Sequence, residues 1–334
     1  MPSSPLTAFA LIEALDEPAL IVGGGRTIAA NKTARALLGE SIVDRDIRIA
    51  VRHPQALGAI LAGRSVDLAV VGLGGAQRPW NLSVRPIANG HCMVRLTDRS
   101  SAIAAERMRV DFVANASHEL RTPLATISGF AETLAEDGPL EDGARTRFGS
   151  TIHNEAARML RIIEDLMGLS RIEADRFVAP RERVDLAAIA QTAAEQAAAL
   201  AERRGCSIDL VAVGQIPVIG DHAQLLQVAD NLISNAVRYG CNPEAPQIRV
   251  EVTSDGPRAM LRITDYGEGI AAAHLPRLTE RFYRVDPARS RDSGGTGLGL
   301  AIVKHIVERH RGTLDIRSSL GAGTVVEVRL PLIN

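Results

Sequence analysis

The sequence predicts a multidomain α+β protein in which a small α/β module precedes an antiparallel helical hairpin and an α/β sandwich. Three observations support this prediction. Short apolar runs between glycine turns fill residues 1–100, helical periodicity fills residues 101–175, and strands alternate with helices over residues 185–334. A chain of 334 residues is long enough for three such domains.

The first hundred residues predict a small sheet with one helix. Residues 19–22 and 27–30 are expected to be paired strands around the glycine turn at 23–25. Asn31 is expected to cap a helix over residues 31–38. Further strands are expected at residues 66–71, 80–86 and 91–96.

The next segment predicts two long amphipathic helices. Apolar residues recur every three to four positions from Ser101 to Glu136 and again from Gly143 to Ile172. Asp137-Gly138-Pro139 separates the two runs. Because one hairpin leaves its apolar stripes partly exposed, we expect it to form a homodimeric four-helix bundle with a second copy.

Residues 176–184 are polar, contain Pro180 and are expected to form a linker. The remainder, residues 185–334, predicts helices covering a mixed sheet. The expected helices are 185–203, 221–239 and 297–309, and the expected strands are 207–213, 247–253, 259–264, 313–318 and 325–330.

Composition narrows the classes of function. A net charge of −1 and an aromatic content of 3% argue against nucleic acid as a direct partner. No apolar run reaches the ~18 residues of a membrane span, and the N-terminus lacks a signal-peptide pattern, so a cytoplasmic location is expected. Cys92, Cys206 and Cys241 are expected to be unpaired thiols, because an odd, sparse count favours a reducing compartment.

One histidine lies in a distinctive frame, Ser117-His118-Glu119-Leu120-Arg121-Thr122-Pro123. On a helix, Thr122 shares the face of His118. We expect Glu119 to hydrogen-bond one ring nitrogen and leave the other as a nucleophile. The alternative for His118 alone is a solvated histidine among surface charges.

A second set of residues predicts a nucleotide site. Asn231 and Asn235 share one helical face, and Arg238 and Tyr239 follow one turn later. Amide oxygens are ligands suited to Mg²⁺, which also binds phosphate oxygens. Arg238 is then expected to contact phosphate and Tyr239 to cover the sugar or base.

Two glycine clusters extend this site. Asp265 ends an expected strand and could accept a hydrogen bond from an amino group such as that of adenine, while Gly267 and Gly269 allow close backbone approach. The second cluster opens a helix, where glycines free the amides to face phosphate. It comprises Gly295, Thr296, Gly297, Leu298 and Gly299.

These motifs, in this order, resemble those of the sensor histidine kinases of two-component signalling. The resemblance covers residues 100–334 and includes Arg281-Phe282-Tyr283-Arg284 and Gly321-Ala322-Gly323-Thr324. It implies a GHKL-type ATP-binding sandwich, ATP and Mg²⁺ as cofactors, and an aspartate of a response regulator as the final phosphoryl acceptor.

The resemblance also implies a role for individual residues. His118 would be phosphorylated, with Glu119 as its acid/base partner. Thr122 would orient water for dephosphorylating the regulator. Asn235 and Asn231 would hold Mg²⁺, Asp265 would bind adenine, and Arg284 would contact the γ-phosphate.

Residues 1–100 look like a PAS sensor domain, and Asp98-Arg99-Ser100 is similar to the exit motif of such domains. Among the subfamilies, the phosphate-regulon sensors are the most similar. Members of this kind usually cross the membrane, whereas no span is expected here. The sequence names neither the stimulus nor a ligand of this domain.

Two alternatives belong to other functional classes. A non-signalling ATPase of the same nucleotide fold would need a catalytic glutamate four residues before Asn235, where this chain has Asn231. A catalytically silent or phosphatase-dominant scaffold would not need His118, Asn235, Asp265 and both glycine clusters intact. The sequence therefore favours the kinase over both.

Overall fold

The computed structural model describes residues 10–73, 77–136, 141–175, 178–286 and 295–333. The chain divides into two compact units, Met1–Val113 and Ala114–Asn334. Helix α4 (Ser100–Ala135) begins in the first unit and continues through the second.

The first unit contains a five-stranded antiparallel sheet in the order β2-β1-β5-β4-β3. Its strands are β1 (Ala19–Gly23), β2 (Arg26–Ala30), β3 (Val66–Val71), β4 (Pro79–Pro86) and β5 (His91–Asp98). Its helices are α2 (Lys32–Leu38) and α3 (Pro54–Leu61), with 3₁₀ turns at Glu40–Ile42, Ile47–Ile49 and Ala88–Gly90. The strands therefore lie where the sequence predicts them.

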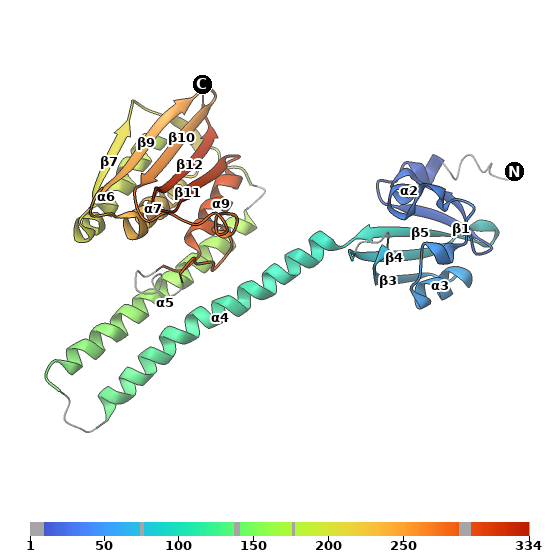
Figure 1. Ribbon diagram of the computed structural model, residues 1–334, viewed down its shortest axis with the longest axis horizontal. Coiled ribbons are helices and arrows are strands. Elements are labelled where there is room, and N and C mark those ends of the chain that lie inside the picture. Colours follow the sequence, from blue (N-terminus) through green and yellow to red (C-terminus); the bar gives the residue numbers. More distant parts are fainter. Residues whose placement is uncertain (1–9, 74–76, 137–140, 176–177, 287–294, 334) are drawn as a thin grey trace. The chain divides into compact units, whose positions relative to one another are not determined.

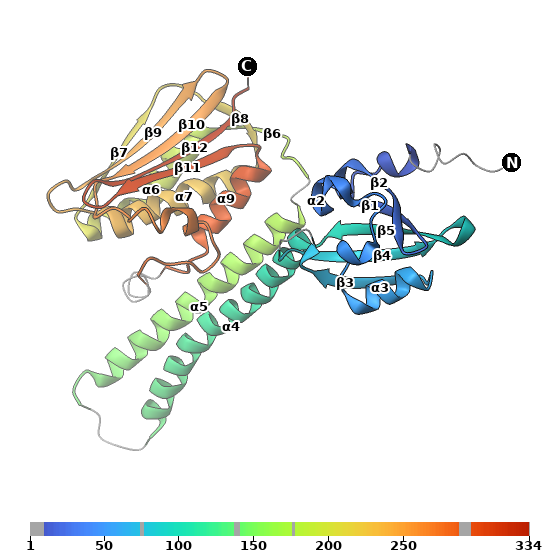
Figure 2. The same ribbon diagram turned by 45° about the vertical axis from the view of Figure 1, so that its right-hand side comes forward.

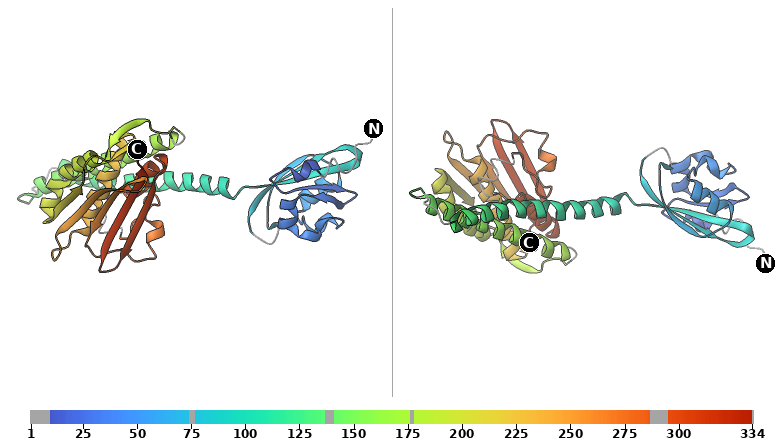
Figure 3. Two further views of the ribbon diagram at one scale, coloured as in Figure 1. Left: turned by 90° about the horizontal axis from the view of Figure 1, so that it is seen from above. Right: turned by 90° about the horizontal axis from the view of Figure 1, so that it is seen from below.

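The main core of this unit packs one face of the sheet against α2 and α3 (Figure 3). Trp80, Leu82 and Leu96 of the sheet pack there with Ala34 of α2 and Ile60 of α3. A smaller cluster covers part of the sheet with the segment around Ile12. The sequence does not predict α3, which is only eight residues long.

Asn31 caps α2 as predicted, because its side-chain oxygen accepts a hydrogen bond from Ala34 N (2.9 Å). The same oxygen also accepts from Ala19 N (3.0 Å) and so links the helix to β1. Asn31 is 1% exposed, and these bonds satisfy a buried amide.

In the second unit, α4 and α5 (Ala144–Ala174) lie side by side as an antiparallel hairpin (Figures 1 and 2). The rings of Phe130 and Phe148 pack with their centroids 4.9 Å apart. Helix α4 continues through Pro123, whose side chain is buried. The predicted break, Asp137-Gly138-Pro139, lies outside the described residues.

The sandwich contains a second five-stranded sheet in the order β11-β12-β10-β9-β7 (Figure 1). Only β7 and β9 pair in parallel; the other neighbours are antiparallel. The strands are β7 (Ser207–Ala212), β9 (Gln247–Asp255), β10 (Arg258–Asp265), β11 (Thr313–Ser319) and β12 (Gly323–Pro331).

Three helices cover one face of this sheet: α6 (Leu186–Arg204), α7 (His222–Gly240) and α9 (Gly299–Arg309). Their buried side chains include Ile233 of α7 and Ile302 of α9, which are fully shielded from solvent. A 3₁₀ turn spans Leu275–Arg277. This layering places the end of α7, the end of β10 and the start of α9 around one cavity.

A two-stranded sheet of β6 (Glu182–Asp185) and β8 (Pro217–Gly220) leads into the sandwich (Figure 2). The sequence predicts a linker at residues 182–184 and no strand at β8. Four-residue strands carry too little alternation to be predicted, and here it is the pairing between them that defines the strands.

The prediction of three unpaired cysteines is wrong. Cys206 and Cys241 form a disulfide with their Cα atoms 6.0 Å apart, and only Cys92 is a free, buried thiol. Cys206 directly precedes β7, and Cys241 ends α7 six residues before β9. Because β7 and β9 pair in parallel, their beginnings are neighbours, which brings the two cysteines together.

None of the helices within the described ranges is both long enough and apolar enough to cross a lipid bilayer.

Candidate functional site

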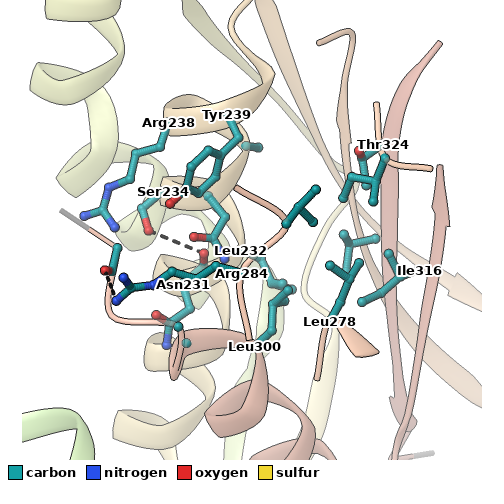
Figure 4. A pocket seen from close by; sticks show the side chains of 18 of the residues that line it. Asn231, Leu232, Ser234, Arg238, Tyr239, Leu278, Arg284, Leu300, Ile316 and Thr324 are labelled. Atoms are coloured by element: carbon teal, nitrogen blue, oxygen red, sulfur yellow. Dashed lines mark hydrogen bonds between the residues drawn. The ribbon is translucent and has the colours of Figure 1, made fainter. Parts of the chain in front are cut away.

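A cavity of about 660 Å³ opens between α7, the ends of the sheet strands, the start of α9 and α5. Figure 4 shows its two kinds of lining. Asn231, Arg238 and Arg284 lie on one side, whereas Leu278 and Ile316 lie on the other. A ligand with a charged end and a flat apolar end would match this division.

Helix α7 supplies most of the polar side. Asp221 caps its N-terminus, where its carboxylate accepts a hydrogen bond from Gln224 N (3.1 Å). About three to five turns further on, Asn231, Asn235, Arg238 and Tyr239 all line the cavity. Burial and the nearby charge of Arg161 lower the pKa of Arg238.

Asp265 lies at the end of β10 on the opposite wall. Its Oδ1 accepts hydrogen bonds from Gly267 N (3.0 Å) and Thr324 N (3.2 Å). Burial raises the pKa of this carboxyl, and those two bonds partly oppose the rise. Asp265 is half-buried, and within the described residues no hydrogen bond reaches Oδ2, so this oxygen could accept from a ligand such as the amino group of adenine.

Glycine is required where β10 meets the end of α7. A Cβ at position 267 would approach the Cα of Gly240 to 2.6 Å, which no side chain tolerates. The two backbones therefore touch beside Asp265. Gly269 lines the cavity, but Gly267 does not, so Gly267 contributes to the packing of the wall.

The second glycine cluster forms the entrance to α9. Gly297 has φ +74°, and its carbonyl accepts a hydrogen bond from Phe282 N (2.8 Å). Gly295, Thr296, Gly297 and Gly299 line the cavity, whereas Leu298 is fully buried beneath it. The N-terminus of α9 is thus presented to the cavity with its positive potential.

His118 is exposed on α4, where its imidazole is open to a reaction partner. Thr122 lies one turn later and donates from its hydroxyl to the His118 carbonyl (3.4 Å). The expected bond from Glu119 to the His118 ring is not present among the described residues. Instead, Glu119 Oε2 accepts from Arg158 (3.1 Å) and Arg284 (2.9 Å), because two guanidiniums lie within its reach.

Arg284 links the histidine segment to the cavity. Its Nη2 donates to Glu119 and also to the carbonyl of Gly295 (2.9 Å) in the second glycine cluster. Its Nε is buried without a hydrogen-bond partner in the part of the chain that the structure describes. Arg284 therefore lines the cavity with a donor still to be satisfied.

Sequence reasoning missed the contribution of α5. Arg161, Glu164 and Asp165 line the cavity, and Asp165 accepts a hydrogen bond from the Thr296 hydroxyl (2.7 Å). Arg158, which holds Glu119, is also on α5. These residues fit an ordinary amphipathic helix, so only the docking of the sandwich on α5 identifies them.

Two family models match the chain. The model of the His Kinase A phospho-acceptor domain matches residues 108–175. The model of the histidine kinase-, DNA gyrase B- and HSP90-like ATPases matches residues 220–334. The first match contains His118 and the second contains Asn231, Asp265 and the glycine segment at the start of α9. The chain belongs to the sensor histidine kinases.

Curated sensor kinases are similar over the same region. The chain is 42% identical over 219 residues to the phosphate regulon sensor protein PhoR of Pseudomonas aeruginosa, covering 66% of this chain and 49% of the relative. It is 36% identical over 239 residues to the sensor-like histidine kinase SenX3 of Mycolicibacterium smegmatis, covering 72% of this chain and 62% of the relative. The matches thus span about half to three fifths of those relatives.

Sensor histidine kinases of known structure share the fold. The histidine kinase ThkA, solved in complex with the response regulator protein TrrA, covers 97% of this chain and 98% of its own, with a TM-score of 0.53 and 18% identity. Acinetobacter baumannii AdeS covers 65% of this chain and 98% of its own, with a TM-score of 0.53 and 23% identity. At these identities the likeness concerns the fold.

Proposed function

We propose that this chain transfers the γ-phosphoryl group of ATP to His118 and then to an aspartate of a response regulator. The observation that carries the proposal is the ion pair between Glu119 and Arg284. It joins Glu119, the neighbour of the exposed His118, to Arg284. Arg284 lines the cavity that has the features of a nucleotide site. Donor site and acceptor would then be neighbours in one compact unit.

The cavity fits ATP at both ends. The spare oxygen of Asp265 would accept from the adenine amino group, and Leu278 and Ile316 would flank the base. Arg238, Arg284 and the amides at the start of α9 would face the phosphates. Tyr239, which is 37% exposed at the rim, would cover the sugar or base.

Asn235 and Asn231 would hold Mg²⁺ through their amide oxygens. Mg²⁺ usually keeps several waters and takes phosphate oxygens as further ligands, so two amide oxygens from the protein suit it. When bound, Mg²⁺ neutralises charge on the phosphates.

At the acceptor, a ring nitrogen of His118 would attack the γ-phosphorus, the bond between that phosphorus and the bridging oxygen would break so that ADP leaves, and Glu119 would take up the proton of the other ring nitrogen. In this conformation Arg158 and Arg284 both bind Glu119, and turning Arg284 to phosphate would release one of these two bonds. Thr122, one turn from His118, would orient water for dephosphorylation of the regulator, which gives a second, phosphatase activity.

We further propose a homodimer through the hairpin. Its α5 exposes Leu160 (61%), Ile163 (40%) and Met167 (53%) at helical spacing, and α4 exposes Leu124 (52%). A second copy would cover these side chains in a four-helix bundle. The domain limits proposed are a sensor at 1–100, the hairpin at 101–175, a linker at 176–184 and the ATP-binding domain at 185–334.

For residues 1–100 we propose a PAS-like sensor, supported by the sheet order of the first unit. The partner would be a response regulator, as ThkA was solved with TrrA. Because ATP is a cytoplasmic nucleotide, the catalytic part would act in the cytoplasm.

The decisive experiment incubates the purified full chain with γ-labelled ATP and Mg²⁺ and then treats the labelled protein with acid or alkali. We expect label that survives alkali, is lost in acid, and is absent from His118→Gln. His153→Gln is the matched control, because His153 is an exposed histidine on α5. Label retained in His118→Gln would refute the assignment of the acceptor.

The outcome also separates the kinase from the alternative. If the wild-type chain binds ATP by calorimetry yet acquires no label, a silent or phosphatase-dominant scaffold becomes the better description.

A further inference from the structure

Helix α5 forms a hydrogen bond with the second glycine cluster, the glycine segment of residues 295–299. The Thr296 hydroxyl donates to Asp165 Oδ2 at 2.7 Å, and Thr296 is 9% exposed. Asp165 has no other side-chain hydrogen bond within the described residues. The bond therefore joins the hairpin to the nucleotide cavity and is well shielded from water.

The Thr296 hydroxyl connects this contact to the entrance of α9. While it donates to Asp165, its oxygen accepts from Leu298 N (3.3 Å). Leu298 is the N-cap residue of α9, and it makes no side-chain cap bond itself. The orientation of the first amides of α9 is thus coupled through Thr296 to a carboxylate on α5.

The hairpin holds the adjacent residue as well. Arg284 binds the Gly295 carbonyl with the same nitrogen that binds Glu119 of α4. Two successive residues are therefore linked to the hairpin. Gly295 is linked to α4 through Arg284, and Thr296 is bonded directly to α5.

Asp165 is poorly suited to contact the nucleotide itself. It is half-buried, and a carboxylate beside a triphosphate would be repelled. Burial raises its pKa, while the bond from Thr296 and the charges of Arg161 and Arg238 oppose the rise. Its role must therefore lie on the protein side of the cavity.

We propose that Asp165 is a positioning residue for phosphoryl transfer, which seats the glycine segment on the hairpin by accepting the hydrogen bond of Thr296. This inference rests on the proposed kinase function and deepens it. The contact exists only when the sandwich is docked on α5, as phosphoryl transfer to a histidine on the hairpin requires. ATP binding by itself needs the walls formed by α7, β10 and α9.

A positioning role predicts that loss of the bond lowers kcat but leaves the dissociation constant for ATP almost unchanged. Asp165→Ala and Thr296→Val are expected to lower kcat for self-labelling about tenfold or more, because a small misplacement of reacting groups is costly. The dissociation constant for ATP, measured by calorimetry, is expected to stay within about threefold, since the adenine end is untouched.

Conservative variants separate a hydrogen bond from a charge. Thr296→Ser keeps the hydroxyl and is expected to retain most of the wild-type kcat. Asp165→Asn keeps an acceptor oxygen of the same size, so it should also stay within about threefold of wild type. If Asp165 were instead an acid, a base or a metal ligand, Asp165→Asn would be as inactive as Asp165→Ala.

Two further controls complete the test. Thr192→Val makes the same change on α6, at a residue that does not line the cavity, and is expected to leave kcat unchanged. The double variant Asp165→Ala/Thr296→Val should be no slower than the worse single variant, because both remove one bond. Retained ATP binding shows that each variant is folded.

The outcomes distinguish the two levels of the proposal. A wild-type chain that acquires no label refutes the kinase function and this inference with it. A wild-type chain that labels while Asp165→Ala labels equally fast refutes only the inference. Additive losses in the double variant, or an inactive Asp165→Asn, would also overturn it.

Discussion

At the scale of single residues, Asp265 has its two oxygens in different environments. Oδ1 is occupied by Gly267 N and Thr324 N, and Oδ2 has no partner among the described residues. Asp265→Asn would keep its carbonyl oxygen on those two amides and turn its NH₂ group toward the ligand. That NH₂ group would oppose the amino group of adenine.

We therefore expect Asp265→Asn to weaken ATP binding by roughly ten- to a hundredfold, the cost of about 1–3 kcal/mol for an unpaired polar group. Inosine triphosphate carries a carbonyl in place of the amino group and should bind the variant better than ATP. Competition calorimetry with both nucleotides measures the preference. An unchanged preference for ATP would mean that Asp265 does not contact the base.

The residue scale also shows what the sequence could and could not predict about the site. Asn231, Asn235 and Asp265 line one cavity because strand ends and helix faces have regular spacing, which a sequence displays. Asp165 and Arg158 could not be found, because nothing local marks them; their importance arises when α5 meets the sandwich. Glu119 was expected to form a hydrogen bond with His118, but it binds Arg158 and Arg284, which are distant in the sequence.

At the scale of elements, long periodic segments were predictable and short ones were not. The limits of α4, α5 and α7 differ from expectation by one or two residues, because amphipathic periodicity over many turns defines a helix. Strands β6 and β8 escaped prediction because each has four residues and is defined by its partner. The pairing of Cys206 with Cys241 depends on the parallel register of β7 and β9, which no local pattern reveals.

The disulfide constrains a long element of the sandwich. It closes a loop with a sequence separation of 35 residues, which contains β7, β8 and α7. On the chain-entropy account, such a loop contributes roughly 3–4 kcal/mol to the free energy of unfolding. We expect Cys206→Ser/Cys241→Ser to lower the stability of the sandwich by up to that amount in urea titrations.

The control for that experiment is Cys92→Ser in the first unit, which removes a thiol outside the loop. The wild-type chain treated with reductant should match the double variant. If the reduced and oxidised chains unfold at the same urea concentration, the bridge contributes nothing to stability.

At the scale of the whole molecule, the second unit joins two activities that the sequence displays separately. The sequence predicts an acceptor segment and a nucleotide segment, whereas the structure adds the contacts of Glu119 with Arg284 and of Asp165 with Thr296. A chain whose sandwich is docked in this way couples the state of the hairpin to the geometry of the cavity. A shift of α4 against α5 would move Glu119 relative to Arg158 and Arg284.

The disulfide between Cys206 and Cys241 also determines whether proteolytic cleavage inside its loop separates the chain into two fragments. Val213 is 77% exposed beside Gly214, in the turn between β7 and β8, where a protease can reach the backbone. We expect a chain cleaved once at this site to migrate like the uncleaved chain on a non-reducing denaturing gel. Two fragments are expected only after reductant is added. Fragments that separate without reductant would show that the bridge is absent. With the disulfide present, Cys206 and Cys241 are joined both by the backbone and by the sulfur–sulfur bond, so cleavage of one peptide bond between them does not separate the chain.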